Sequence, residues 1–348
     1  MRLLVWSKIL SFCLICVFLS ACQAGYNDKL EDYLGRLENI LNEDRPPKKS
    51  ISVGLIKFPN KRDSQFQLSE QQQSIGILEF LSLDECKIQQ TIAEKNNNLG
   101  KVASQSQQLL NSIAFISYSP ACLALLKENG KNQLNKKLKD SLQIKKKQLP
   151  ALLWQATLNE AEYRAFWKTA NIDFSYPESL PPKQADAIKQ LIKFTQNTLN
   201  FTEIDQNLED TLGVIRLGDG GQLFSAYAHL HHQLNIANEI VEKALNKPFC
   251  SAGRTNAKIK ILNNMMTVFF IPEIQQLSNQ LNMRYQAIMP HILQLEELHI
   301  ETEHSNFRDW RIKRNQFFDL ARNSTRKHVK LINQLYQQCA AKPKGKSL

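Results

Sequence analysis

The chain has 348 residues, of which 43% are hydrophobic and 22% charged, and its formal net charge is +11 at pH 7. A basic balance of this kind is compatible with nucleic-acid binding. The N-terminus predicts export, however, so we expect the protein to meet anionic lipid headgroups, lipopolysaccharide and cell-wall polymers. Nucleic acid is therefore excluded as an expected partner.

Residues 1–21 have the three parts of a secretory signal peptide. Arg2 and Lys8 form the charged region, residues 9–19 form the apolar region, and the motif Leu-Ser-Ala-Cys ends at Cys22. A membrane-spanning helix needs roughly 20 apolar residues, so this shorter run does not favour a permanent span. Cleavage before Cys22 would remove two of the 44 basic residues and none of the 33 acidic ones, which leaves a mature charge of +9.

The motif that ends at Cys22 matches the lipobox of bacterial lipoproteins. In those proteins the thiol receives diacylglycerol, the chain is cut before the cysteine, and the new amine is usually acylated. Two or three acyl chains form a stable membrane anchor, so Cys22 is the predicted lipidation site. An ordinary signal peptide with a chance cysteine is the alternative. By resemblance to Gram-negative lipoproteins, Gln23 instead of Asp favours the periplasmic face of the outer membrane.

The first predicted helix, residues 27–43, carries an apolar stripe with Leu30 and Leu37 and begins soon after Cys22. This helix either packs into the body or lies on the membrane, and its acidic outer face disfavours an anionic surface. Residues 45–68 contain three prolines and form an extended segment, in which residues 51–58 are either a short strand or a stretch lying over helices. A capping box at residues 69–72 predicts the next helix start.

The rest of the chain is predicted to be helical, because good helix formers dominate and apolar residues recur three or four positions apart. We expect Pro120, Pro150 and Pro290 to start, end or bend helices. The predicted helices are residues 71–80, 84–94, 101–116, 121–129, 131–148, 151–170, 183–212, 222–245, 255–289 and 306–341. The expected fold class is all-α, an irregular multi-helix bundle with one extended Pro-rich segment.

Three prolines within residues 175–182 mark the expected internal boundary. The expected organisation is a signal peptide (1–21), a lipidated N-terminus with the first helix (22–44), an N-terminal helical lobe (45–180), a C-terminal helical lobe (181–341) and a basic tail (342–348).

Four cysteines remain after Cys22 is lipidated, and an even number of thiols in an oxidising compartment suggests disulfides. No pair has the Cys-x-x-Cys spacing that would favour the zinc alternative. We pair Cys86 with Cys122, because a hairpin turning near residues 96–100 returns the chain to the same end. We pair Cys250 with Cys339, because a reversal between residues 290 and 306 makes the two arms similar in length.

Two segments, residues 227–232 and 296–304, are dense in potential metal ligands. Glu-x-x-His occurs twice in the second segment, but copies five residues apart on one helix point about 140° apart and cannot share a metal unless the helix breaks. We therefore expect a solvated polar helix end there, and neither a metal nor another cofactor. The alternative is a metal-dependent hydrolase acting on cell-wall or lipid material. Its candidate residues are His229, His231, His232, Glu296, His299, Glu301 and His304.

Other motifs give no sign of catalysis, since nucleophile-elbow, His-Glu-x-x-His and Walker patterns do not occur. The glycine-rich residues 218–221 lack a phosphate loop's Lys-Ser/Thr and predict a tight turn. The lysines of residues 131–148 form either a solvated face or a contact for anionic lipid. Asn97 and Lys101 lie in a polar connection and are candidate interaction residues, because polar loops on a rigid scaffold often bind partners. A plain helix-capping turn is the alternative.

Four short motifs resemble a known family. They are residues 76–81 with Cys86 close behind, residues 93–101 (AEKNNNLGK), residues 119–122 (SPAC) and residues 150–154 (PALLW). Over most of its mature length the chain resembles a family of uncharacterised proteobacterial lipoproteins, the domain of unknown function numbered 3080. The resemblance implies an envelope location and brings no activity, and only the lipid site at Cys22 is carried over. We expect a lipid-anchored, non-enzymatic helical interaction module with another envelope protein as its partner.

Overall fold

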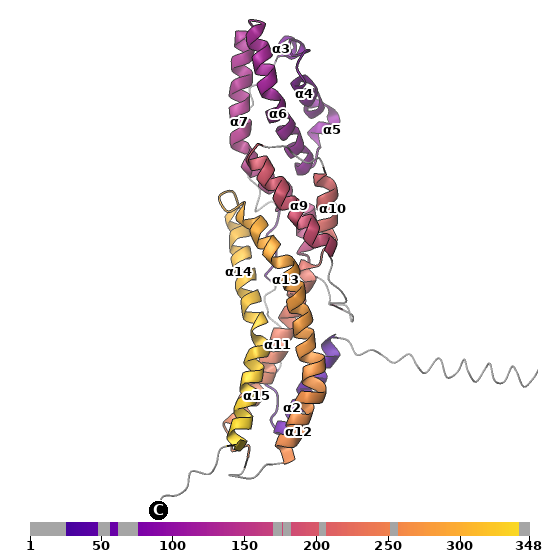
Figure 1. Cartoon of the computed structure of the whole chain (residues 1–348), viewed down its shortest axis with the longest axis vertical. Coiled ribbons are helices and arrows are strands. Elements are labelled where there is room, and N and C mark those ends of the chain that lie inside the picture. The colour runs from indigo at the N-terminus through magenta and orange to yellow at the C-terminus, as the bar shows by residue number, and fades with distance from the viewer. Residues whose placement is uncertain are drawn as a thin grey trace, which may run out of the picture.

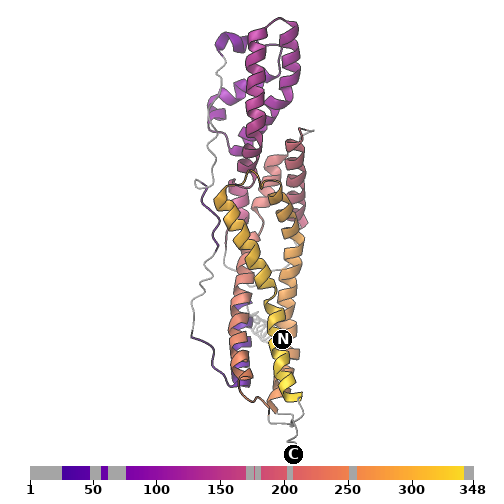
Figure 2. The ribbon, with the colours of Figure 1, turned by 90° about the vertical axis from the view of Figure 1, so that its left-hand side faces the viewer.

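The computed structural model describes residues 26–47, 56–61, 76–169, 176, 182–201, 207–250 and 257–340. Every regular element in these residues is helical, and the helices stack into one elongated rod (Figures 1 and 2). The all-α fold predicted from the sequence is therefore confirmed. Cys22, the signal peptide, the capping box at residues 69–72, the basic tail and most of the Pro-rich segment lie outside the described residues.

The upper part of the rod is a helical hairpin supported by shorter helices (Figure 1). α6 (Gln105–Glu128) and α7 (Asn132–Thr157) form the hairpin, α4 (Ile88–Asn96) packs against α6, and α3 (Ile77–Leu81) and α5 (Asn98–Lys101) flank α4 in the chain. The turn at the tip is a Schellman motif, in which Lys131 N–H donates to the Leu126 carbonyl at 2.9 Å. Gly130 has a φ of 69° in this turn, which explains why a residue without a Cβ is found there.

The middle of the rod contains α8 (Ala161–Phe166), α9 (Pro182–Leu199) and α10 (Leu208–Arg216), and α9 contacts α7, α10 and α13. The helices of the lower part are α2 (Tyr26–Leu41), α11 (Gly220–Leu245), α12 (Ala257–Met265), the π-helix η2 (Met266–Gln275), α13 (Gln276–Glu297), α14 (Ser305–Arg322) and α15 (Ser324–Ala340). α11 is central to this part, because it contacts α2, α13, α14 and α15.

The first helix packs into the body. Leu30, Leu34 and Leu37 of α2 are fully buried, and the helix contacts α11, α12 and η2. The acidic residues on its outer side are held by arginine, since Arg45 pairs with Glu31 at 2.9 Å and with Glu38 at 2.7 Å. Of the two positions predicted for this helix, the one inside the bundle is confirmed.

Two groups of buried side chains form the core. The larger runs from α2 to α15 and contains residues from both sides of the expected boundary at residues 175–182, such as Trp154 and Ile188. The smaller lies at the tip, where Leu83 from the segment between α3 and α4, Leu126 of α6 and Leu138 of α7 pack around a disulfide.

The helix start predicted at Pro120 and the helix end predicted at Pro150 are wrong, whereas the bend expected at Pro290 stays a prediction. Pro120, Pro150 and Pro290 lie inside α6, α7 and α13, and Pro272 lies inside the π-helix. A proline in a helix removes one hydrogen bond and costs about 3 kcal/mol or more. Each of these helices packs along the rod over many buried residues, and that burial outweighs one missing bond. The final predicted helix also differs, since it divides between α14 and α15 near Asn323.

Both disulfides join the cysteines that the sequence analysis paired. Cys86 is bonded to Cys122 beside the tip, with Cα atoms 5.3 Å apart. Cys250 is bonded to Cys339 at the lower end, with Cα atoms 5.1 Å apart. Each bridge therefore joins two distant segments near one end of the rod. The bonded cysteines are 36 residues apart in the sequence at the tip and 89 residues apart at the lower end.

One described helix, α6, is long and apolar enough to cross a membrane if length and composition alone are considered. In its most apolar window 44% of the residues are buried inside the protein. Its Leu109 and Ile113 belong to the core of the bundle, and a core helix satisfies the same criterion.

Candidate functional site

A buried ion pair lies near mid-height of the rod, where α8, α13 and α14 meet. Arg314 donates from Nη1 to Glu296 Oε1 at 2.7 Å and from Nη2 to Oε2 at 2.6 Å. The Tyr163 hydroxyl donates to Oε1 at 2.6 Å. All three side chains are at most 1% exposed, so the charges are compensated by each other and by the phenol instead of by water.

Aromatic rings enclose the guanidinium of Arg314. Its Cζ lies 4.5 Å from the ring centre of Trp167 and 4.6 Å from that of Trp310, a distance at which the ring faces attract a cation. Residues 56–61 cover this cluster. The Trp310 indole N–H donates to the Ile56 carbonyl at 3.2 Å, and the Phe58 ring centre lies 4.5 Å from that of Trp310. This part of the Pro-rich segment thus lies over helices and is not a strand (Figure 2).

Neither charged group of this cluster is free to react with a substrate. Both oxygens of Glu296 accept hydrogen bonds, and the pair has almost no surface that a substrate could reach. Burial, and then the neighbouring Glu296 charge, raise the pKa of Tyr163 well above its ordinary value, so the phenol stays protonated and remains a donor. The cluster therefore joins three helices and offers no free acid or base.

The solvated polar helix end predicted for residues 296–304 is wrong for three of its members. Glu296, His299 and Glu303 are 0%, 1% and 5% exposed. The helix does break here, since α13 ends at Glu297, but the acidic groups face cations and not a shared metal. Glu303 accepts hydrogen bonds from Arg308 at 2.9 Å and from Arg311 at 2.8 Å.

The sequence analysis missed the arginines that pair with these acids. Arg308, Arg311 and Arg314 are spaced three residues apart, which places them along one side of α14. An acidic helix end followed closely by arginines at this spacing is a signal for a returning helix that pairs with it.

His231 of α11 is held by two side-chain contacts. His231 accepts at Nε2 from the Asn235 amide at 2.9 Å, so its Nδ1–H donates to the Ser324 hydroxyl at 2.6 Å. Burial lowers the pKa of both His229 and His231. In the part of the chain that the structure describes, no group of three or more His, Cys, Asp or Glu side chains could hold a metal ion.

The glycine-rich turn at residues 218–221 is a packing element. A Cβ on Gly218 would lie 2.4 Å from Phe166 Cδ2, and one on Gly220 would lie 2.2 Å from Phe166 Cε1. The glycines therefore let the α10–α11 connection approach α8 closely. Asp219 in the turn accepts two hydrogen bonds from Arg284, at 2.6 and 2.9 Å. The chain turns here as predicted, although Gly220 and Gly221 already belong to α11.

A neutral polar group attaches α2 to the lower part of the rod. His328 Nε2 lies 2.5 Å from the Tyr33 hydroxyl, and its Nδ1 lies 2.8 Å from Asn238 Oδ1. Because Asn238 Oδ1 can only accept, Nδ1 carries the proton and Tyr33 donates to Nε2. Burial lowers the pKa of His328 to about 3, so the ring is neutral. Helices α2, α11 and α15 meet at this point.

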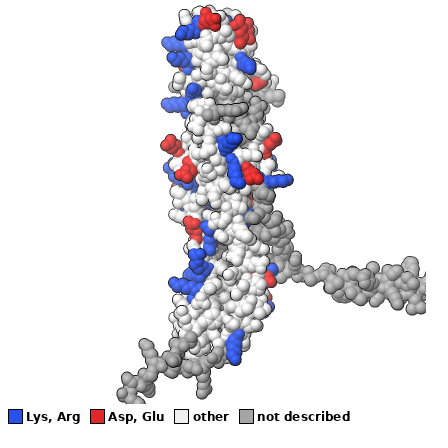
Figure 3. Space-filling view, viewed as in Figure 1, with Lys and Arg blue, Asp and Glu red and all other residues white. Residues whose placement is uncertain are grey.

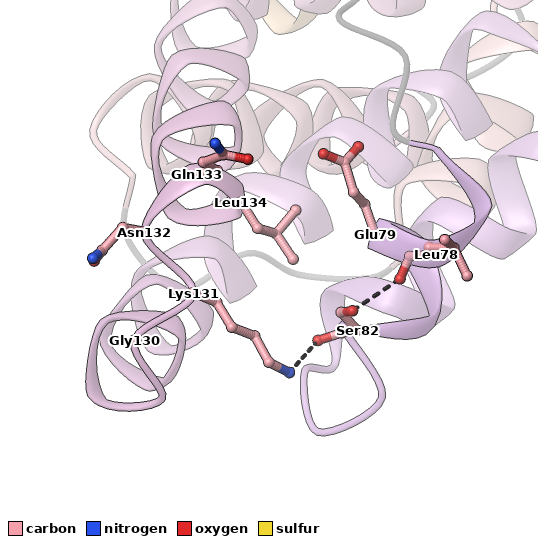
Figure 4. Close-up of a pocket in the computed structure, with 8 residues that line it drawn as sticks. All are labelled: Leu78, Glu79, Ser82, Gly130, Lys131, Asn132, Gln133 and Leu134. Atoms are coloured by element: carbon pink, nitrogen blue, oxygen red, sulfur yellow. Dashed lines mark hydrogen bonds between the residues drawn. The ribbon is translucent and has the colours of Figure 1, made fainter.

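The tip carries an open hollow of about 430 Å³ (Figure 4). It lies between α3 and the first turn of α7 and is lined by Leu78, Glu79, Ser82, Gly130, Lys131, Asn132, Gln133 and Leu134. Lys131 Nζ donates to the Ser82 carbonyl at 3.0 Å across one side of it. Leu78 is 76% exposed at the rim. The hollow thus combines an apolar rim with polar amides, which suits a shallow protein contact more than a small molecule.

Of the two predicted interaction residues, Asn97 lies directly before α5 and Lys101 is the last residue of α5. The Asn97 side chain accepts a hydrogen bond from Gly100 N–H at 2.7 Å, which is the capping turn that the sequence analysis considered as the alternative. Gly100 is tightly packed, because a Cβ there would lie 2.1 Å from the Glu94 carbonyl oxygen. The side chain of Lys101 lies outside the described residues, so its interaction role remains a prediction.

The lysines of α7 are divided between contacts and solvent. Lys137 pairs with Glu79 at 2.5 Å, and Lys145 lies over the Phe115 ring at 5.1 Å. Burial, and then repulsion by Lys95, lower the pKa of Lys145 to about 8. Figure 3 shows basic side chains along the upper edge of the rod, on the side where α7 runs, with acidic side chains near the tip.

Comparison with known proteins gives one match. The model of the family described as "Protein of unknown function (DUF3080)" matches residues 30–343. No curated protein and no solved structure matches the chain.

Proposed function

Because the chain belongs to the DUF3080 family of proteins of unknown function, which supplies no activity, we propose its function from its own residues. The protein is a lipoprotein of the cell envelope, anchored through Cys22 at the periplasmic face of the outer membrane. Its helical rod is a non-enzymatic interaction module that presents its tip to another envelope protein.

The observation that carries this proposal is the attachment of the helix that follows the lipobox. Only three residues separate Cys22 from α2, and α2 is buried against α11, α12 and η2. A lipid on Cys22 would therefore hold the whole rod and not a loose tail. Such an arrangement suits a protein that must keep a fixed position relative to a membrane.

The tip supports the second half of the proposal. Its hollow is open, its rim includes the exposed Leu78, and the Cys86–Cys122 bridge joins α6 to the segment between α3 and α4. The buried acids Glu296 and Glu303 are both engaged in ion pairs with arginines, which favours a structural role for them. The hydrolase alternative has no supporting observation, because His231 and Glu296 are both held by structural hydrogen bonds.

Two measurements on the full precursor test the proposal. Labelled palmitate should enter the wild-type chain and be lost from Cys22→Ser, which should also accumulate uncleaved. Equal labelling of Cys22→Ser would contradict the lipid anchor.

The partner is tested by a photocrosslinking amino acid placed at Leu78 in cells, with the same residue at Leu217 as the control. Leu78 and Leu217 are 76% and 77% exposed, so they differ in place and not in accessibility. We expect a discrete protein adduct from Leu78 only. Adducts of equal strength from both positions, or none from Leu78, would contradict the tip as the interaction site.

A further inference from the structure

The outer side of η2 and of the last part of α12 carries exposed apolar side chains, together with the uncharged polar Asn263, Asn264 and Thr267. Residues 261–272 contain no charged side chain. Within this stretch Ile261, Val268 and Ile271 are 55%, 65% and 50% exposed, and Pro272 is also exposed. We call these four residues the flank patch. Figure 3 shows the lower part of the rod as largely uncharged on the side where α12, η2 and α13 face the viewer. Exposed apolar side chains that gather in this way mark a contact surface.

The flank patch lies next to the point where the anchored end of the chain joins the rod. Lys29, in the first turn of α2, pairs with Glu273 at 2.6 Å, and Glu273 directly follows Pro272. Cys22 is four residues before Tyr26, so an extended chain allows it to lie at most about 14 Å from the start of α2. A lipid on Cys22 therefore cannot hold the tip or the lower end of the rod at the membrane without also bringing this flank close.

The charges around the flank patch are balanced. Asp32 pairs with Arg36 at 3.0 Å, and the Arg36 guanidinium lies 4.6 Å from the ring centre of Phe269 in η2. Lys29 and Glu273 neutralise each other, and the exposed Lys260 lies toward the lower end. These five side chains, together with the exposed Asp28 of α2 and Lys258 of α12, carry a net charge of +1, which would not repel anionic headgroups.

We infer that the flank patch is a membrane-contact surface, which inserts its apolar side chains among lipid headgroups while the acyl chains on Cys22 hold the chain there. The inference rests on the proposed lipid anchor. It also predicts how the rod is oriented relative to the membrane. Helices α12, η2 and α13 run along the rod, so contact through the flank patch would place the long axis of its lower half parallel to the membrane (Figure 1). The lower half of the rod then lies along the membrane surface and does not stand upright on one end.

The test uses the full, processed lipoprotein reconstituted in vesicles of phosphatidylethanolamine and phosphatidylglycerol. A photocrosslinking amino acid replaces Val268, and the control places it at Leu320 of α14, which is 59% exposed and thus comparably accessible. We expect phospholipid adducts by mass spectrometry on the Val268 protein and only background on the Leu320 protein. Equal lipid labelling of both positions, or none at Val268, would overturn the inference.

A second variant separates insertion from mere proximity. The crosslinker is placed at Ile261 in a chain that also carries Val268→Asp and Ile271→Asp, two exposed positions where a carboxylate is compatible with the fold. We expect the lipid adduct at Ile261 to be lost, while the unfolding temperature stays near that of the parent. An unchanged adduct would contradict insertion of the patch.

The mass of the N-terminal peptide is measured in the same samples. An unmodified Cys22 would show that the proposed anchor is wrong. An acylated Cys22 without labelling at Val268 would overturn only the orientation. The same crosslinker at Val268 in cells provides a further check, since a protein adduct there in place of lipid would identify the patch as a protein interface and refute the membrane contact.

Discussion

Lowering the pH from 7 to 5 should destabilise this protein through two buried histidines, His299 and His328. Burial lowers the pKa of each ring to about 3 in the folded state, whereas the ordinary value is 6.5. Below pH 6.5 the unfolded chain therefore binds protons that the folded chain does not. Stability from these residues is complete above that pH and is lost progressively as the pH falls toward 3.

The size of the effect follows from the two pKa values. One pKa unit corresponds to about 1.4 kcal/mol, and pH 5 lies about 1.5 units below the unfolded pKa, so each ring costs about 2 kcal/mol at pH 5. Both rings are at most 1% exposed, so solvent screening does not reduce this value much. Together they remove about 4 kcal/mol, which is a large part of a typical unfolding free energy of about 5–15 kcal/mol.

The assay is equilibrium urea unfolding, followed by circular dichroism, of the mature chain and of His299→Gln and His328→Gln at pH 7 and pH 5. Glutamine is uncharged at both pH values and can still donate and accept hydrogen bonds. The measured quantity is the difference in unfolding free energy between the two pH values, which cancels any loss common to both. We expect this difference to shrink by about 2 kcal/mol in each variant. Variants that keep the full wild-type difference would refute the reasoning.

Three further predictions concern stability. Arg314→Met should lower the unfolding free energy by about 3–5 kcal/mol, because it leaves Glu296 buried and unpaired. Combining it with Glu296→Leu should recover most of this loss, as measured by urea unfolding. A double variant that is as unstable as Arg314→Met would contradict this prediction. Gly220→Ala places a Cβ against the Phe166 ring of α8 and should lower the unfolding free energy by about 1–3 kcal/mol. The control is Gly213→Ala, whose Cβ has nothing within 4 Å, and it should leave the thermal unfolding temperature unchanged or raise it. Removing the Cys250–Cys339 disulfide, whose cysteines are 89 residues apart in the sequence, should lower the unfolding free energy by about 4–5 kcal/mol. An unchanged urea midpoint of unfolding would contradict a structural role for this bridge.

The disulfide pairing could be predicted because it depends on coarse geometry. Hairpin reversals and arm lengths bring cysteines to a common end, and errors of a few residues in helix ends do not change that outcome. The reversal comes after Glu297, within the predicted interval of residues 290–306, and Cys250 is bonded to Cys339 as predicted. Similarly, the stripe on α2 identified its buried side, because the 3.6-residue period is a local property of the sequence.

The buried cluster of Tyr163, Glu296 and Arg314 could not be predicted in the same way. Whether Glu296 faces solvent or a cation depends on which helix returns beside it, and that is a tertiary property. A carboxylate at a helix end is usually solvated, so the local pattern favoured the wrong environment. The prolines show the same limit. A proline's local cost is real, but Pro150 lies in a helix whose neighbouring Leu149, Leu152 and Leu153 are buried, and only the complete packing reveals that balance.

The buried contacts of the rod suggest why an anchor at one flank could position a surface at the tip. Residues far apart in the sequence are joined at successive heights: Cys250 to Cys339 at the lower end, Tyr33 to His328 in the lower part, and Glu296 to Arg314 near the middle. Above these contacts, α6 and α7 contribute to both the larger core and the smaller core at the tip, and neither helix is interrupted between the two. A hinge in this bundle would have to separate buried charges, a disulfide or a continuous helix, so we expect the rod to resist bending. Joined in this way, the rod would let the proposed lipid anchor hold the proposed tip surface at a constant distance from the membrane.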